Sequence, residues 1–259
     1  MIRNILIKSG LYNPIRNLYN FIFLFNTKRE VRFGDIIVRF RTPTFKIVDD
    51  VKSLLGEEEV LSTFLSKLQP GDVVWDVGAS YGIYSLFVGK KFSSIKVYAF
   101  EPEQKTFKLL KKNLDLNGID NVIPINYALG DIDGAAILHT SSSANIGTHS
   151  LVQRSDYPVL EKGVSVEIRR GDTIVTTGKV DFPTIVKIDV EGSEFIVLKG
   201  IEEILSNPKL RLVQIEIHPK IFPLFGSTTE DIYRLMNESK FKVVFRKERG
   251  TEVEVIFEK

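Results

Sequence analysis

From residue 72 onward, the chain alternates short apolar runs with amphipathic segments. Runs rich in β-branched and aromatic residues, apolar at nearly every position, are typical of parallel strands buried on both faces. Between these runs, apolar residues recur every three or four positions, as on one face of a helix. The expected strands are residues 72–77, 95–100, 122–127, 184–190 and 210–217, and the expected helices are residues 81–91, 104–117, 194–205 and 229–239.

This alternation predicts an α/β fold, a Rossmann-like, mostly parallel sheet with helices on both faces. The tail, residues 241–259, predicts an antiparallel hairpin at or near one edge of the sheet. Residues 132–183 interrupt the alternation and are expected to form elements on the substrate side. Within them, the polar stretch SSSANIGTHS, residues 141–150, is long enough to act as a substrate loop.

The first 52 residues are expected to form a separate region, followed by one domain at residues 53–259. Its basic, aromatic arm is too short and too often interrupted to span a bilayer. The arm packs on the body or, alternatively, lies on an anionic membrane surface or docks a partner. The stretch DIIVRFRTPTFKIV, residues 35–48, predicts a β-hairpin, and residues 57–68 have helical spacing.

Charge and cysteine content exclude several classes of protein and of chemistry. The formal net charge of +2 argues against a dedicated nucleic-acid binder, and no DNA partner is expected. The absence of cysteine excludes disulfides, thiolate ligands and thiol nucleophiles, and it fits a reducing cytoplasm. We therefore expect a cytoplasmic protein, with peripheral membrane contact through the arm as the alternative.

Three of the expected strands end in acids, which are Asp76, Glu101 and Asp189. In doubly wound sheets, ligands bind beyond the carboxyl ends of the strands. Buried carboxylates are costly unless something pairs with them. Several acids converging on one edge therefore indicate a ligand that is rich in hydroxyl groups or in positive charge.

The turn after the first of these strands has the spacing D-x-G-x-x-x-G, in which Gly78 and Gly82 let the backbone approach a ligand closely. Glu101 follows Gly78 by 23 residues and ends the second strand, where an acid can accept both ribose hydroxyls. Asp76 would repel a pyrophosphate but could hold an ammonium group. The pattern favours S-adenosylmethionine over a nicotinamide dinucleotide.

The motifs VVWDVGASYGIYSL, VYAFEPEQKTFKLLKKNLDLNG, NYALGD and IVKIDVEGSEFIVLKG resemble the FkbM-type S-adenosylmethionine-dependent methyltransferases, over residues 54–220 or so. The resemblance implies a seven-stranded methyltransferase fold that usually methylates hydroxyl groups on sugars, polyketides or other glycan-type acceptors. By position, the resemblance implies a glycine loop, an acid that binds the ribose and a strand end that lies beside the adenine. It also implies two signature acids, Asp189 and Glu191. The residues expected to bind the donor are Asp76, Gly78, Ala79, Ser80, Tyr81, Gly82, Glu101, Pro102, Asn126, Ala128 and Asp189.

The fourth-strand motif Asp189-Val190-Glu191-Gly192 lacks the Pro-Pro-aromatic pattern of enzymes that methylate amino groups. A hydroxyl acceptor is favoured, because an oxygen nucleophile must lose a proton and a carboxylate can take it. The stretch QIEIHP places Glu216 and His218 on one side of the next strand. The candidate catalytic residues are Asp189, Glu191, Glu216 and His218.

Several alternatives stay open at this point. A divalent metal is not expected, although Asp189, Glu216 and His218 offer ligands that suit magnesium or manganese. The same acids also have structural interpretations, as helix caps or as partners of arginines. Ribose methylation of RNA through the basic arm and a non-catalytic cofactor-binding role are the alternative functions. The sequence identifies neither the acceptor molecule nor the oligomeric state.

Overall fold

The computed structural model describes residues 14–15, 18, 27–140, 149–150 and 163–259. Most of the N-terminal arm and residues 141–148 of the expected substrate loop lie outside these ranges. Among the described residues, no helix has the length and apolar character needed to cross a membrane.

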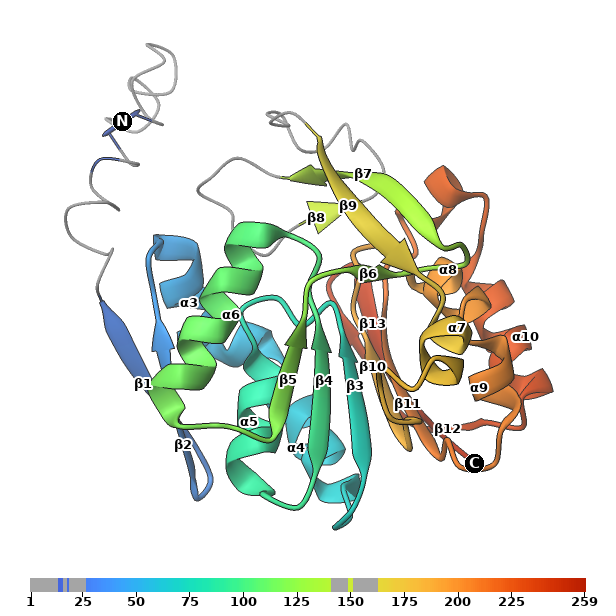
Figure 1. The fold of residues 1–259 in the computed structure, drawn as a ribbon, viewed down its shortest axis with the longest axis horizontal. Coiled ribbons are helices and arrows are strands. Elements are labelled where there is room, and N and C mark those ends of the chain that lie inside the picture. The colour runs from blue at the N-terminus through green and yellow to red at the C-terminus, as the bar shows by residue number, and fades with distance from the viewer. Residues whose placement is uncertain (1–13, 16–17, 19–26, 141–148, 151–162) are drawn as a thin grey trace.

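A mostly parallel sheet of seven strands forms the centre of the molecule, in the order β12-β13-β11-β10-β3-β4-β5 (Figure 1). The prediction of a mostly parallel α/β sheet is thereby confirmed. The predicted antiparallel C-terminal hairpin is also confirmed, because β13 runs antiparallel to both of its neighbours. The strands are β3 (Val73–Val77), β4 (Lys96–Phe100), β5 (Val122–Ile125), β10 (Ile185–Ile188), β11 (Leu212–Ile217), β12 (Lys242–Arg249) and β13 (Glu252–Glu258).

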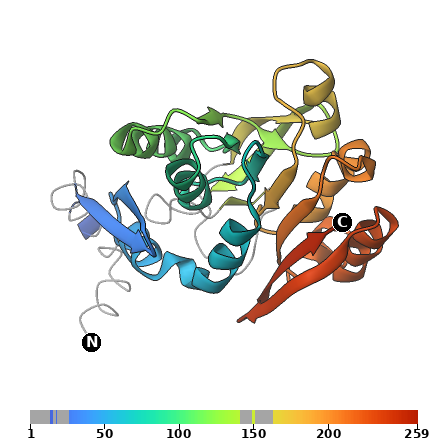
Figure 2. The ribbon, with the colours of Figure 1, turned by 90° about the horizontal axis from the view of Figure 1, so that it is seen from below.

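Helices cover both faces of this sheet, as Figures 1 and 2 show. Successive strand residues point to opposite faces, so Val74 packs in the core under the first set of helices and Trp75 in the core under the second. The first set is α4 (Glu58–Lys67), α5 (Ile83–Lys91) and α6 (Gln104–Asn117), and the second is α7 (Gly171–Thr176), α8 (Glu194–Lys199), α9 (Glu202–Ser206) and α10 (Thr229–Glu238).

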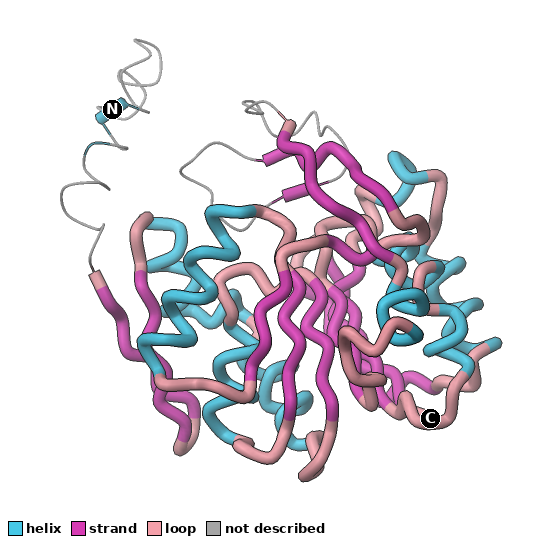
Figure 3. The backbone as a smooth tube through the Cα atoms, viewed as in Figure 1, coloured by secondary structure: helices cyan, strands magenta, loops and turns pink. Residues whose placement is uncertain are grey.

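The segment between β5 and β10 forms a small second sheet above the carboxyl ends of the parallel strands (Figure 3). Its order is β6-β9-β7-β8, and β7 and β9 pair antiparallel. The small sheet thereby covers one side of the carboxyl edge of the main sheet. The strands of the small sheet are β6 (Ala128–Leu129), β7 (Gly134–Thr140), β8 (His149–Ser150) and β9 (Val164–Arg169).

The N-terminal hairpin lies earlier in the chain than its predicted position. β1 (Lys28–Phe33) and β2 (Ile36–Arg41) pair antiparallel across Gly34 and Asp35. The predicted hairpin over residues 35–48 is wrong in its second half, because FKIV begins α3 (Phe45–Ser53). Thr44 caps this helix, and its hydroxyl accepts a hydrogen bond from the Ile47 amide at 3.3 Å.

The residues before β3 pack on the body of the fold. Val38 and Phe40 of β2 are fully buried in the same core as Phe87 of α5. A short 3-10 turn, η2 (Leu54–Gly56), then connects α3 to α4, and Glu57 follows directly. The domain boundary near residue 52 stays a prediction.

Candidate active site

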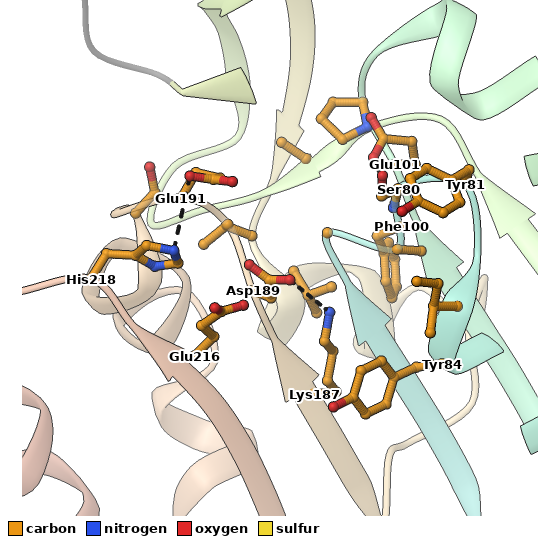
Figure 4. A pocket seen from close by; sticks show the side chains of 18 of the residues that line it. Ser80, Tyr81, Tyr84, Phe100, Glu101, Lys187, Asp189, Glu191, Glu216 and His218 are labelled. Carbon is orange, nitrogen blue, oxygen red and sulfur yellow. Dashed lines mark hydrogen bonds and ion pairs between the residues drawn. The ribbon is translucent and has the colours of Figure 1, made fainter. Parts of the chain in front are cut away.

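One pocket lies at the carboxyl ends of β3, β4, β10 and β11, and Figure 4 shows it closely. Asp76, Gly82 and Asn126 are expected donor-binding residues that are not in its wall. The other expected residues line it, namely Gly78, Ala79, Ser80, Tyr81, Glu101, Pro102, Ala128, Asp189, Glu191, Glu216 and His218.

The glycine loop after β3 passes unusually close to β10. Gly78 has a φ of +79°, and a Cβ built there would lie 1.8 Å from the carbonyl oxygen of Asp189. Any side chain at this position would therefore collide with the backbone that carries the signature acid. The D-x-G spacing follows from this contact between two neighbouring strands.

Glu101 is a buried acid whose two oxygens are held by backbone amides. Oε2 accepts from the Ser80 amide at 3.0 Å, and Oε1 accepts from the Glu103 amide at 2.7 Å. Burial raises the pKa of Glu101 to about 8, although these amides act in the opposite direction. Asn126 supports the same loop, because its side-chain amide donates to the carbonyl oxygens of Glu101 and Pro102 at 2.8 and 3.0 Å. The carboxylate is thus fixed in position to face a ligand.

Asp76 lies beneath the pocket instead of in its wall. Its Oδ2 accepts from the amide and the hydroxyl of Ser85 at 3.1 and 2.6 Å, and its Oδ1 lies 3.6 Å from the Lys187 ammonium. The side chain is only 2% exposed. The structure therefore does not place this carboxylate where the sequence pattern expected it to meet a donor ammonium.

Lys187 is a buried cation that sequence reasoning missed. Its ammonium lies 3.2 Å from Asp189 Oδ2 and 4.9 Å from the centre of the Tyr84 ring. Burial alone would lower the pKa of Lys187, but Asp189 and Asp76 outweigh burial and raise it. Burial likewise acts to raise the pKa of Asp189, and the Lys187 charge overcomes it and lowers that pKa. At neutral pH the two side chains form an ion pair.

His218 is positively charged at neutral pH. Its Nδ1 lies 2.8 Å from Glu194 Oε1, and its Nε2 lies 3.9 Å from Glu191 Oε2. Burial opposes the charged form, but the hydrogen bond and charge of Glu194 raise the pKa of His218 to about 9. A protonated imidazole cannot accept a proton, so the structure does not favour His218 as a general base.

Glu216 belongs to a group of three buried acids that the sequence did not indicate. Glu254 is its direct cross-strand neighbour, and oxygens of Glu57, Glu216 and Glu254 lie within 4.8 Å of one another. The Arg249 guanidinium bonds to Glu216 and lies 3.6 Å from Glu57 and 3.8 Å from Glu254. Burial, with the neighbouring carboxylates, raises the pKa of Glu57 to about 8 and that of Glu254 to about 7.

The three residues of the metal alternative lie close together and already have partners. Asp189, Glu216 and His218 do bring ligand atoms within 4.8 Å of one another. Lys187 and Arg249 already supply positive charge to the two carboxylates, and the His218 Nδ1 is engaged by Glu194. We therefore do not propose a metal site among the described residues.

A mostly parallel sheet in this strand order, with a glycine loop after β3 and a fixed acid after β4, is the arrangement expected of an S-adenosylmethionine-dependent methyltransferase. The methyltransferase FkbM domain model matches residues 76–243, so the chain belongs to the FkbM methyltransferase family.

Curated relatives agree with this family. Hexuronic acid methyltransferase AglP of Haloferax volcanii is 31% identical over 209 residues, which cover 81% of this chain and 80% of that protein. The 31-O-demethyl-FK506 methyltransferase FkbM of Streptomyces tacrolimicus is 28% identical over 178 residues, 59% of this chain and 67% of that protein. Among solved structures, methyltransferase FkbM of Methylobacillus flagellatus matches 74% of this chain and 45% of that chain, with 18% identity and a TM-score of 0.48.

Proposed function

We propose that this protein transfers the methyl group of S-adenosylmethionine to a hydroxyl group of a sugar, glycan or other small hydroxylated molecule. The observation that carries the proposal is that one pocket joins Glu101 and the glycine loop to the acids at the ends of β10 and β11. Donor and acceptor would thus meet above Asp189, which lies between the two halves (Figure 4).

In the donor half, Glu101 accepts hydrogen bonds from the two ribose hydroxyls, and Gly78 lets the backbone lie against the donor. The neighbouring Ala128 and Leu129 offer a short apolar wall. In the acceptor half, carboxylates serve as hydrogen-bond acceptors for hydroxyl groups. The relative whose name specifies a hexuronic acid supports a sugar acceptor.

Asp189 is the group that we assign to receive the hydroxyl proton. It is kept ionised by Lys187, and 21% of its side chain is exposed to the pocket. As the acceptor oxygen forms its bond to the methyl carbon, the carbon–sulfur bond breaks and sulfur keeps the electron pair. The proton passes to the Asp189 carboxylate, and positioning by the pocket supplies most of the acceleration.

The test is transfer of labelled methyl from the donor to a panel of glycosides, hexuronic acids and RNA, with the product located by nuclear magnetic resonance. We expect an O-methylated sugar and no labelled RNA. Asp189→Asn should lower kcat on the order of 10²- to 10⁴-fold with little change in donor affinity. Glu238→Gln, an exposed acid on α10, is the matched control. Label on nitrogen or carbon, or native turnover by Asp189→Asn, would refute the assignment.

A further inference from the structure

Glu57 lies outside the region that matches the family model, yet it lines the pocket. It stands between η2 and the first turn of α4, and only 3% of it is exposed. The segment before β3 therefore delivers a carboxylate into the site that the strand–helix alternation forms. No motif in the sequence pointed to this residue.

Glu57 is held next to the glycine loop. The Tyr84 hydroxyl accepts from the side-chain amide of Gln214 at 2.9 Å, and the charge of Glu57 adds to burial in raising the pKa of Tyr84. Tyr84 lies in the first turn of α5, two residues after Gly82 ends the loop. Glu57 Oε1 has no hydrogen-bond partner among the described residues, and the Arg249 guanidinium lies 3.6 Å from it. A buried carboxylate oxygen without a hydrogen bond is costly and is suited to a ligand donor.

The methyl donor carries an ammonium group. Three other acids of the pocket already accept hydrogen bonds, whereas Arg249 lies 3.6 Å from Glu57 Oε1 without a hydrogen bond to it. Both oxygens of Glu101 accept backbone amides, Asp189 pairs with Lys187, and Glu216 pairs with Arg249. Asp76, the residue that the sequence pattern indicated, faces Ser85 beneath the wall. We propose that Glu57 binds the primary ammonium group of the methyl donor, an inference that rests on the proposed function.

The charges around Glu57 fit a cationic ligand. It faces Lys187 on β10, Asp189 directly after β10, Glu216 on β11, Arg249 on β12 and Glu254 on β13. Burial, Glu254 and Asp189 hold the pKa of Glu57 near 8 in the ligand-free protein. An ammonium group arriving between these acids favours the ionised carboxylate and displaces its proton.

The experiment is titration calorimetry on the full chain with S-adenosylhomocysteine and with its analogue in which hydrogen replaces the amino group. The native protein should bind the analogue more weakly than S-adenosylhomocysteine. In Glu57→Gln, we expect affinity for S-adenosylhomocysteine to fall on the order of tenfold or more, because a charge-assisted hydrogen bond is lost. Affinity for the deaminated analogue should stay within about twofold of native.

Glu58→Gln, an exposed acid in the adjacent position, is the matched control and should bind both ligands as the native protein does. If Glu57→Gln does not fold, Glu57→Asp replaces it and should show a smaller loss that is again confined to S-adenosylhomocysteine. Equal losses for both ligands, or unchanged affinity for S-adenosylhomocysteine, would overturn the role of Glu57. A native protein that binds neither ligand would instead overturn the proposed function.

Discussion

At the scale of single residues, a buried lysine organises the acids of the site. Lys187 is the direct cross-strand neighbour of Asp76 on β3, and it also pairs with Asp189 two residues further on. A lysine side chain that is 6% exposed is tolerated only because both carboxylates surround it. The charge of Asp189, and with it the proposed proton transfer, depends on this cation.

Lys187→Met should therefore lower the free energy of unfolding by about 3–5 kcal/mol, because it leaves two buried carboxylates without their cation. Urea denaturation of the ligand-free protein measures the loss. The control is Lys96→Met, which removes an ammonium 2.5 Å from Asp181 at a half-exposed surface position. Its effect should be far smaller, since surface ion pairs contribute little. Equal losses in the two variants would contradict the structural role of Lys187.

The sequence indicated part of this site and missed the rest for identifiable reasons. Glu101 and Asp189 follow strands in a recurrent motif, so their positions at one edge could be predicted. Lys187 was detectable as the one charge within the apolar run IVKI, which must find a carboxylate partner. The sequence did not indicate Glu57 or Arg249 as site residues. An acid just before a helix and an arginine just before a turn are usually surface residues.

At the scale of elements, the fold depends on how closely neighbouring backbones approach. A helix was expected over residues 194–205, but the structure contains two, α8 and α9, with Gly200 and Ile201 between them. A Cβ on Gly200 would lie 1.9 Å from the carbonyl oxygen of Gly130. The periodic pattern predicted helical structure correctly but revealed neither the break nor the close approach of Gly130 to Gly200.

The wrong hairpin over residues 35–48 has a different cause. The run FKIV is too short for its period to distinguish strand from helix. Thr44 caps α3, and Ile47, Val48 and Val51 form the buried face of this helix. The apolar pattern did not distinguish a strand from a helix here, and the cap formed by the Thr44 side chain favours the helix.

Gly78→Ala tests the close approach of β3 and β10. Gly78 and Gly118 both have positive φ, +79° and +60°, but a Cβ on Gly118 meets nothing within 4 Å. Gly118→Ala should cost about 1 kcal/mol of stability from backbone strain alone. Gly78→Ala should cost clearly more and should abolish donor binding, because β10 must move away from the loop. Urea denaturation and calorimetry check both effects, and equal behaviour of the two variants would argue against the contact.

At the scale of the whole molecule, buried groups of the site make stability depend on pH. Burial raises the pKa values of Glu57 and Glu101 to about 8 and that of Glu254 to about 7, above the ordinary 4.5. Glu194, against the effect of burial, raises the pKa of His218 from 6.5 to about 9. At pH values between the ordinary pKa of each group and its raised pKa, the folded state binds more protons than the unfolded state.

The free energy of unfolding of the ligand-free protein should consequently fall as pH rises from about 5 to about 9. Each group contributes fully below its unfolded pKa and loses its contribution as pH passes its folded pKa, with a slope of at most about 1.4 kcal/mol per pH unit for each proton. Urea denaturation at several pH values measures the slope, which Glu57→Gln should reduce. A stability that is level or rises over this range would contradict the prediction.

The position of β13 has a consequence for how the protein is made. Residues 252–258 lie between β11 and β12, two strands that precede them in the chain. Before this segment is synthesised, one edge of β11 has no partner strand. Glu216 then also lacks its neighbour Glu254, and Arg249 has only just been added to the chain. An unpaired apolar strand of this kind can pair wrongly with other chains. Between the synthesis of β11 and that of β13, a nascent molecule is therefore expected to pair wrongly more readily than the finished sheet does.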